Sequence, residues 1–328
     1  MSFTVFVTAP RLAAPGAALL AQQGARVLYL SQADDPIEVE GILAAQPVDA
    51  VISRTVALSS RAIRSCPTLK VISKHGVGVS NIDVEAASAR GIPVYVTPGT
   101  NAQSVAELTL GLMFSAARRI AWMDAELRAG RWTRAQDGVE LCGRTLGLVG
   151  FGQIGQRVAR VAQALGMEVV AFDPMLAGKP SPVEGVTLVD SLDALLPLAD
   201  VLSLHVPLNG HTRGMLGEAQ FARLPHGAIV INTARGEVID EPALVAALRD
   251  GKLAAAGLDT MAVEPLPAGS ALASLPNVVL TPHVGGSTPA ALDAMATGAA
   301  RNVLGWLQGR PVDPSACINP QVLAHRTH

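Results

Sequence analysis

Three apolar runs in the second half of the chain lead into side chains that could bind an anion or exchange a proton. AIVINTA precedes Arg235, AAAGLD precedes Glu264, and NVVLTPH ends on His283. An arginine holds a carboxylate or a carbonyl oxygen through a planar fork of donors. A histidine exchanges protons near neutral pH, and a neighbouring carboxylate favours its charged form. Together these residues suit the reduction of a 2-keto acid, in which hydride addition produces an alkoxide that must be protonated.

Each of the three residues also has an ordinary structural explanation when it is considered alone. Arg235 could be a surface charge, Glu264 a solvated loop residue before a proline, and His283 the cap of a helix. Their shared placement favours chemistry, because ligands of open parallel sheets bind beyond the carboxyl ends of the strands. We therefore expect all three at one edge of a sheet, where a cofactor would also lie.

A glycine-rich segment, GFGQIG over residues 150–155, joins the apolar run TLGLV to the helical sequence QIGQRVARVAQAL. Gly150 allows a tight turn, Gly152 lets a pyrophosphate approach the backbone, and Gly155 permits close packing of helix and strand. The first amides of the helix, at Gln153 and Ile154, can donate to the phosphates. The motif alone is weak evidence, but its position between a strand and a helix predicts a dinucleotide site.

The strand EVVAFD, which follows this helix, ends on Asp173. A carboxylate there can accept hydrogen bonds from the hydroxyls of an adenosine ribose, and it would repel a 2′-phosphate. No arginine occurs over residues 174–178. These features favour NAD over NADP as the cofactor.

The rest of the chain alternates short apolar runs with helical stretches, which predicts parallel sheets built from βαβ units. One such series fills residues 1–99, and a second begins at TLGLV. Residues 102–131 read as a long helix, continuous or interrupted, and residues 288–309 as another helix with no strand beside it. We infer that this last helix packs on the first series. The first domain then comprises residues 1–99 and 288–328, and it encloses a second domain at 100–287.

The composition argues against several classes of function. With 49% hydrophobic and 16% charged residues among 328, the chain can bury the cores of two domains. A net charge of −2 without blocks of like charge argues against a nucleic-acid surface. No apolar run reaches the roughly 18 residues of a membrane span, and MSFTVFVTAP is a poor signal peptide. The three cysteines are widely spaced, so we expect a cytoplasmic protein without a metal site or a disulfide framework.

Four motifs together resemble the D-isomer-specific 2-hydroxyacid dehydrogenases, a family that includes phosphoglycerate, hydroxypyruvate, glyoxylate and D-lactate enzymes. They are GFGQIG, NTARGEVID, the Asp259–Pro265 segment and PHVGGST, and the similarity covers approximately residues 49–310. The resemblance implies an α/β fold of two Rossmann-like, doubly wound domains, with the cofactor domain inserted in a discontinuous substrate domain. It also implies that Arg235, Glu264 and His283 are catalytic, that the cofactor is NAD, and that subunits form homodimers. The related formate dehydrogenases carry glutamine in place of the glutamate, so Glu264 argues against that branch.

We further expect cofactor contacts from the glycine-rich segment and from residues at strand ends of the second domain. The complete expected set is Gly150, Gly152, Gln153, Ile154, Gly155, Asp173, His205, Val206, Pro207, Thr212, Thr233, Ala234, Arg235, Asp259, His283 and Gly285.

The segment KHGVGVSNID, residues 74–83, resembles the substrate loop of the family. Consecutive backbone amides in a glycine-rich turn can bind an anion. The resemblance implies that the amides of this turn, in the stretch Gly76, Val77 and Gly78, hold the carboxylate of the substrate. Ser80 stands where the family commonly has aspartate, a change that we do not expect to alter the chemistry.

Basic residues near this loop bear on the size of the substrate. Arg54 and Lys74 each follow an apolar run, so both should lie at the same sheet edge, and Arg134 matches a basic position of phosphoglycerate dehydrogenases. These cations would suit a second anionic group such as a phosphate, unless they are ordinary surface charges. The sequence thus predicts a phosphoglycerate dehydrogenase-like enzyme, with a glyoxylate or hydroxypyruvate reductase as the alternative. A NAD-sensing corepressor is the alternative from another class, and it would be distinguished by the absence of turnover.

Overall fold

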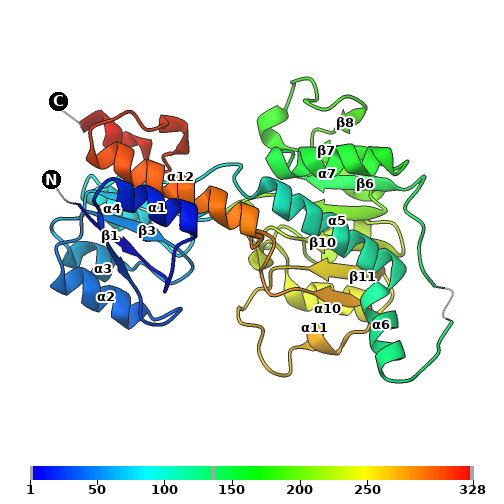
Figure 1. The fold of residues 1–328 in the computed structure, drawn as a ribbon. Coiled ribbons are helices and arrows are strands. Elements are labelled where there is room, and N and C mark those ends of the chain that lie inside the picture. The colour runs from blue at the N-terminus through cyan, green and yellow to red at the C-terminus, as the bar shows by residue number, and fades with distance from the viewer. Residues whose placement is uncertain (1–2, 135–136, 326–328) are drawn as a thin grey trace. The chain divides into compact units, whose positions relative to one another are not determined.

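The chain consists of two compact units, which a computed structural model describes over residues 3–134 and 137–325 (Figure 1). The first unit contains Met1–Asn101 and Ser287–His328, and the second contains Ala102–Gly286. Each unit has its own parallel sheet, of five strands in the first and seven in the second. The expected α/β class, with two doubly wound parallel sheets, is confirmed.

The first unit is a five-stranded sheet covered by helices on both faces. Its strands are β1 (Thr4–Val7), β2 (Arg26–Tyr29), β3 (Ala50–Ser53), β4 (Val71–Lys74) and β5 (Val94–Tyr95), and its helices are α1 (Ala14–Gln22), α2 (Pro36–Ala45), α3 (Ser60–Ser65), α4 (Val84–Ala89) and α12 (Pro289–Leu307). The strand order is β2-β1-β3-β4-β5. Successive residues of a strand point to opposite faces. Accordingly, Phe6 packs with α2, α3 and α4, whereas its neighbours Val5 and Val7 pack with α1 and α12.

The C-terminal helix α12 packs directly on α1 and on the first sheet. A Cβ at Gly16 of α1 would lie 2.7 Å from backbone atoms of Ala296 in α12, so this approach requires glycine. Asn302 Nδ2 donates to Ser73 Oγ at 3.2 Å and to the carbonyl of Val96 at 3.0 Å. These contacts explain why a helix without a strand of its own is stable at this place in the chain.

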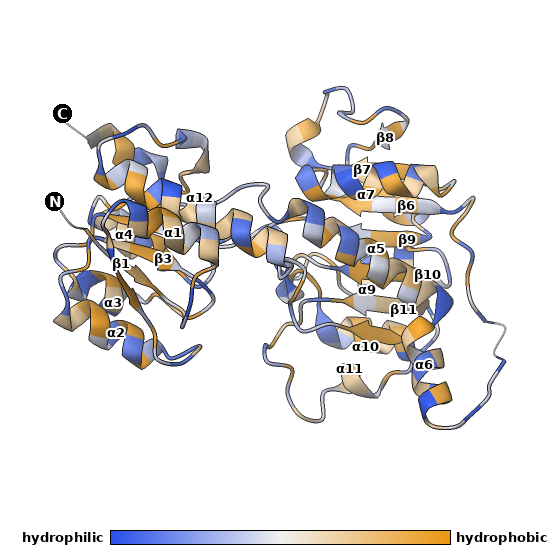
Figure 2. Cartoon of the chain, in the orientation of Figure 1, coloured by the Kyte–Doolittle hydropathy of each residue, from blue (hydrophilic) through white to orange (hydrophobic). Residues whose placement is uncertain are grey.

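The second unit is a seven-stranded sheet, also covered on both faces. Its strands are β6 (Thr145–Val149), β7 (Glu168–Phe172), β8 (Val186–Leu188), β9 (Val201–Leu204), β10 (Ala228–Asn232), β11 (Leu253–Leu258) and β12 (Val278–Leu280), and its helices are α5 (Ala102–Arg118), α6 (Ile120–Arg128), α7 (Gln153–Ala164), α8 (Leu192–Leu195), α9 (Glu218–Arg223), α10 (Glu241–Arg249) and α11 (Ala271–Ser274). Buried residues of α5 and α7 form the core on one face, and those of α8 to α11 form the core on the other. Figure 2 shows the mixed apolar and polar surface of α7, whose buried side includes Val158 and Ala162.

The strand order of this sheet, β12-β11-β10-β9-β6-β7-β8, reverses direction between β6 and β9. All of its strands run parallel, so their carboxyl ends lie at one edge. In such sheets the reversal point leaves a crevice at the carboxyl edge that commonly binds a ligand.

The helical stretch expected over residues 102–131, continuous or interrupted, is interrupted at Arg119, whose left-handed φ of 52° separates α5 from α6. The strands β5 and β8 were not predicted from the sequence, because strands of two and three residues show too little periodicity. Among the described residues, no helix combines the length and apolar character that crossing a bilayer requires.

Candidate active site

The three residues expected to be reactive follow three neighbouring strands of the second sheet. Arg235 comes after β10, Glu264 after β11 and His283 after β12. Because β10, β11 and β12 pair side by side and in parallel, their carboxyl ends bring the three loops together. The structure therefore places Arg235, Glu264 and His283 at one edge, as the sequence analysis predicts.

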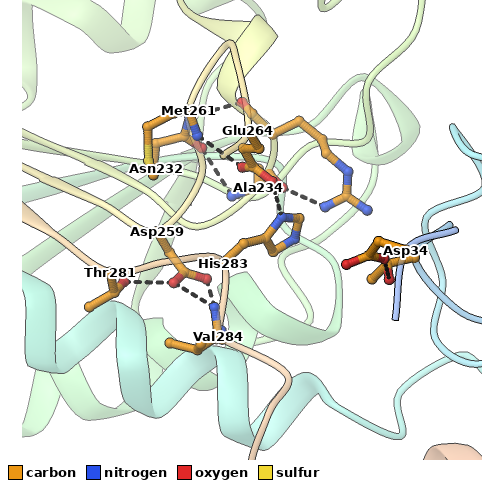
Figure 3. Close-up of polar contacts among 12 residues, drawn as sticks. Asp34, Asn232, Ala234, Asp259, Met261, Glu264, Thr281, His283 and Val284 are labelled. Atoms are coloured by element: carbon orange, nitrogen blue, oxygen red, sulfur yellow. Dashed lines mark hydrogen bonds and ion pairs between the residues drawn. The ribbon is translucent and has the colours of Figure 1, made fainter. Parts of the chain in front are cut away.

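A direct contact joins His283 to Glu264 (Figure 3). His283 Nδ1 lies 2.8 Å from Glu264 Oε2, and the other carboxylate oxygen accepts a hydrogen bond of 3.0 Å from the amide of Met261. Burial acts to raise the pKa of Glu264, but these two hydrogen bonds and the charges of His283 and Arg235 together hold it below its usual value. Glu264 is thus a carboxylate at neutral pH, held against the His283 ring.

Arg235 is partly buried in the loop after β10. Its Nη1 donates to the carbonyl of Ala234 at 2.6 Å. The side chain of Asn232 bonds to the loop twice, donating to the carbonyl of Arg235 and accepting from the amide of Ala234, each at 2.9 Å. Burial lowers the pKa of Arg235, while the carboxylates of Glu264 and Glu237 act to raise it. One nitrogen of the guanidinium, Nη1, is therefore bonded to the loop, and the other N–H groups can donate to an anion.

Gly236 brings the loops of Arg235 and Glu264 close to one another. A Cβ at this position would overlap the backbone of Met261 and Ala262, so no other residue fits without moving one of the loops. Gly236 lies within the motif NTARGEVID, but its role was not predicted, because the sequence next to Arg235 does not show that the loop of Met261 packs against it.

Asp259, at the end of β11, holds the loop that carries His283. The residue is 1% exposed, and its carboxylate accepts from Thr281 Oγ1 at 2.6 Å and from the amides of Val284 and Gly285 at 2.9 and 2.8 Å (Figure 3). The carbonyl of Asp259 also accepts from the amide of His283 at 2.8 Å. His283 has a left-handed φ of 52°, which is uncommon for a residue with a side chain. The cofactor contact expected of Asp259 stays a prediction, and the loop contacts were not foreseen.

The glycine-rich turn between β6 and α7 has room for a ligand at one glycine only. Gly150 has a φ of 91°, and a Cβ there would lie 2.5 Å from the carbonyl oxygen of His205. A Cβ at Gly155 would lie 2.6 Å from the carbonyl oxygen of Gly150. A Cβ at Gly152 would meet no atom within 4 Å. Gly150 and Gly155 are thus required by the fold, whereas Gly152 borders open space, as a pyrophosphate site needs.

The start of α7 also suits an anion. Its N-cap is Gly152, which has no capping side chain, and its first turn contains no acidic residue. The first amides, including those of Gln153 and Ile154, are therefore available to phosphate oxygens. The residues of this turn fit a dinucleotide.

Asp173 lies at the end of β7, next to the turn. One oxygen accepts from the amide of Phe151 at 2.8 Å, and the other from the amide of Met175 at 2.9 Å. Asp173 also lines a cavity of about 160 Å³ together with Lys179, whose Nζ donates to the carbonyl of Met175 at 2.9 Å. Lys179 was not predicted to lie near the cofactor, although its proximity to Asp173 in the sequence was a usable signal.

The other expected cofactor residues follow β9 and β10. His205 Nε2 lies 3.0 Å from Ser203 Oγ, and burial lowers the pKa of His205 to about 4, so this imidazole is neutral. Thr212 Oγ1 donates to the carbonyl of Pro207 at 2.6 Å. Val206, Thr233 and Ala234 lie in the same two loops after β9 and β10, and cofactor binding by this group stays a prediction.

In the first unit, Arg54 and Lys74 lie at the carboxyl ends of β3 and β4, the expected edge. Lys74 is only 9% exposed, and its Nζ donates to Asn81 Oδ1 at 2.6 Å and to the carbonyl of Arg54. Its ammonium is thus already hydrogen-bonded within the first unit, and the substrate contact expected of Lys74 stays a prediction. Arg54 Nη1 lies 3.0 Å from Nε2 of His75. Burial and the charge of Arg54 lower the pKa of His75 to about 3, so this histidine is neutral.

The loop after β4 presents two amides without a partner. Gly76, with a φ of 121°, donates its N–H to Thr97 Oγ1 at 3.0 Å. Within residues 3–134 and 137–325, the amides of Val77 and Gly78 donate no hydrogen bond. Consecutive free amides of this kind can bind a carboxylate.

Comparison with known proteins is consistent with this geometry. Residues 110–285 match the sequence model described as "D-isomer specific 2-hydroxyacid dehydrogenase, NAD binding domain". The D-3-phosphoglycerate dehydrogenase of Methanocaldococcus jannaschii is 46% identical over 248 residues, which are 75% of this chain and 47% of that protein. The hydroxypyruvate reductase of Thermotoga maritima is 46% identical over 246 residues, 74% of this chain and 79% of that protein. This chain therefore spans about half the length of the first relative but most of the second.

A solved structure shows the same fold over nearly the whole chain. The TT0316 protein of Thermus thermophilus superposes with a TM-score of 0.87 at 38% sequence identity. The superposition covers 96% of this chain and 100% of the other.

Proposed function

This chain belongs to the D-isomer-specific 2-hydroxyacid dehydrogenases, and on that premise we propose that it interconverts a 2-keto acid and a D-2-hydroxy acid with NAD. One observation carries the proposal: His283 Nδ1 and Glu264 Oε2 lie 2.8 Å apart, at the sheet edge that also holds Arg235. A histidine held by a carboxylate next to an arginine is the arrangement that protonating a new alkoxide requires.

When bound, the dinucleotide would supply a hydride as NADH in reduction and accept one as NAD⁺ in oxidation. His283 directs Nδ1 to Glu264, which leaves Nε2 to give a proton to the substrate oxygen in reduction and to take one in oxidation. The ionised Glu264 stabilises the imidazolium form. Arg235 holds the carboxylate or the carbonyl oxygen of the substrate through its free donors.

We propose that the dinucleotide is held by the start of α7, the open side of Gly152 and the carboxylate of Asp173. The substrate carboxylate is assigned to the free amides of Val77 and Gly78, on the geometry of that loop alone.

For the substrate we propose a keto acid with a second anionic group, such as phosphohydroxypyruvate. The supporting observation is Arg54, whose guanidinium contacts the neutral His75 and forms no ion pair with a carboxylate in the described part of the chain. The name of the M. jannaschii relative agrees with this choice. The name of the T. maritima relative favours the alternative, hydroxypyruvate or glyoxylate reduction.

The test is a panel of 2-keto acids assayed with NADH: glyoxylate, hydroxypyruvate, phosphohydroxypyruvate, pyruvate and branched acids. We expect turnover that falls by roughly 10²–10⁴-fold in His283→Ala, the usual contribution of a positioned acid–base group. Two results together would support a dianionic substrate. The wild type should prefer phosphohydroxypyruvate, and Arg54→Ala should lower kcat/KM for phosphohydroxypyruvate more than for glyoxylate. NADH binding without turnover of any acid would instead favour a NAD-sensing binding protein.

We also propose that the protein works in the cytoplasm as a homodimer. Its cysteines, Cys66, Cys142 and Cys317, are all free, as is usual in a reducing compartment. The second unit exposes large apolar side chains near α6, at Ile120, Leu127 and Trp132, which a second copy of the chain would cover.

A further inference from the structure

Two hydroxyl groups on α5 contact the loops that carry His283 and Arg235. We propose that Ser104 and Thr109 are positioning residues that hold these two loops in the reactive arrangement. The inference rests on the proposed function for its kinetic consequences, but its structural consequence can be measured without turnover.

Ser104 bonds to the loop of His283 at the same residue that Asp259 holds, Gly285. Its side chain is buried, and Oγ donates to the carbonyl of Gly285 at 2.5 Å. The amide of the same Gly285 donates to Asp259 Oδ2 at 2.8 Å. The backbone of Gly285, two residues beyond His283, is thus bonded on both sides of the residue. Its N–H donates to Asp259 at the end of β11, and its C=O accepts from Ser104 on α5.

Thr109 holds the loop of Arg235 in a similar way. Thr109 Oγ1 donates to the carbonyl of Val105 at 2.8 Å and lies 2.8 Å from Thr233 Oγ1. A hydroxyl has one proton, and that of Thr109 is used on Val105, so Thr233 donates to Thr109. Both hydroxyls are buried, and Thr233 precedes Arg235 by two residues.

The helix that carries both hydroxyls is itself closely packed on the sheet. A Cβ at Gly257 of β11 would lie 2.9 Å from the Cβ of Leu112 and 3.3 Å from its carbonyl oxygen, both on α5. Because glycine permits this approach, α5 packs tightly on the sheet and can hold the loops of His283 and Arg235 in place.

The loop of His283 needs such support, because its left-handed φ of 52° is unfavourable for a residue with a side chain. Strained backbone of this kind persists where several contacts over-determine it. Removing the Ser104 hydroxyl takes away one of these contacts, which lets the loop relax and loosens the approach of His283 to Glu264.

The experiment compares Ser104→Ala and Thr109→Val with Ser115→Ala. Ser115 also lies on α5, and its hydroxyl makes no hydrogen bond within the described residues, so this variant controls for loss of a hydroxyl from the helix. For each protein we would measure kcat and KM, the melting temperature, and the titration midpoint of the His283 ring by NMR, assigned with His283→Ala. Ser104→Cys replaces Ser104→Ala if the latter does not fold.

We expect kcat to fall about ten- to a hundred-fold in Ser104→Ala, as for a small misplacement of a catalytic group. The midpoint of His283 should move to lower pH, towards that of Glu264→Gln. Thr109→Val should lower kcat/KM for the keto acid without moving that midpoint, and Ser115→Ala should change neither. A lower melting temperature with unchanged kcat and midpoint in Ser104→Ala would overturn the proposal. If the wild type turns over no keto acid and the midpoint still moves, the proposed function fails while the positioning role stands.

Discussion

The pairing of His283 with Glu264 makes the rate depend on pH in opposite senses for the two directions of the reaction. Reduction needs a protonated His283, so its rate falls as pH rises, whereas oxidation needs the neutral ring, so its rate rises. The low pKa of Glu264 keeps it charged across this range, and that charge favours the protonated ring. Glu264→Gln should therefore move both limbs to lower pH. Single-turnover profiles in both directions would measure this.

The control for that comparison is a variant of similar chemistry outside the loop, Glu218→Gln on α9, which should leave both limbs in place. Limbs that stay fixed in Glu264→Gln while hydride transfer is rate-limiting would show that Glu264 is not the partner of His283 in catalysis.

Arg235 is expected to serve the substrate rather than the dinucleotide. Arg235→Ala should lose most of kcat/KM for the keto acid and leave the dissociation constant of NADH nearly unchanged. Arg235→Lys should also be poor, because an ammonium cannot reproduce the planar fork of donors. Steady-state kinetics and a fluorescence titration with NADH separate the two effects. Weak NADH binding with a normal KM for the keto acid would contradict this assignment.

Asp173 determines which cofactor we expect at the end of β7. Its carboxylate accepts hydrogen bonds from Phe151 and Met175, so it stays in place to repel a 2′-phosphate. We predict at least a tenfold preference for NADH over NADPH, or about 1.4 kcal/mol. Asp173→Ala should reduce this preference for NADH. The carboxylate that repels a 2′-phosphate is then absent, and the nearby positive charge of Lys179 remains. Equal kcat/KM for the two cofactors in the wild type would refute the prediction.

In the turn between β6 and α7, one glycine is needed for folding and another for binding the dinucleotide. Gly155→Ala brings a Cβ to 2.6 Å from the carbonyl oxygen of Gly150, so we expect a lower melting temperature. Gly152→Ala meets no atom within 4 Å and should fold normally. It should nevertheless weaken NADH binding tenfold or more, because the methyl group occupies the approach of the pyrophosphate. Melting curves and NADH titrations of the two variants form a matched pair, and unaltered binding in Gly152→Ala would place the dinucleotide elsewhere.

At the scale of the whole molecule, the surface around α6 bears on the oligomeric state. No residue of α6 is buried, and Leu127 and Trp132 are 54% and 76% exposed. Sedimentation at micromolar concentration should give a dimer, and Leu127→Asp should shift it towards monomer. Ile37→Asp, at an apolar residue of α2 in the first unit that is even more exposed, should leave the oligomeric state unchanged. A wild type that sediments as a monomer would refute the proposed homodimer.

The features that could be predicted from the amino-acid sequence are those that depend on residues close together in the chain. A strand, a glycine-rich turn and a helix follow one another within residues 145–164, so the dinucleotide turn is recognisable locally. Arg235, Glu264 and His283 could be placed at one edge because each follows an apolar run, and parallel strands share a carboxyl edge. The fold class and the family follow from these patterns.

The contacts that could not be predicted, and that the folded chain reveals, join residues far apart in the sequence. Asp259 reaches Gly285, Ser104 reaches Gly285 from α5, and Gly236 lies against the backbone of Met261. The inward turn of Lys74 likewise depends on where Asn81 lies. Periodicity and propensity record how a segment relates to its own neighbours. Such contacts depend instead on how separate segments pack, because a buried donor must meet whichever acceptor the fold brings to it.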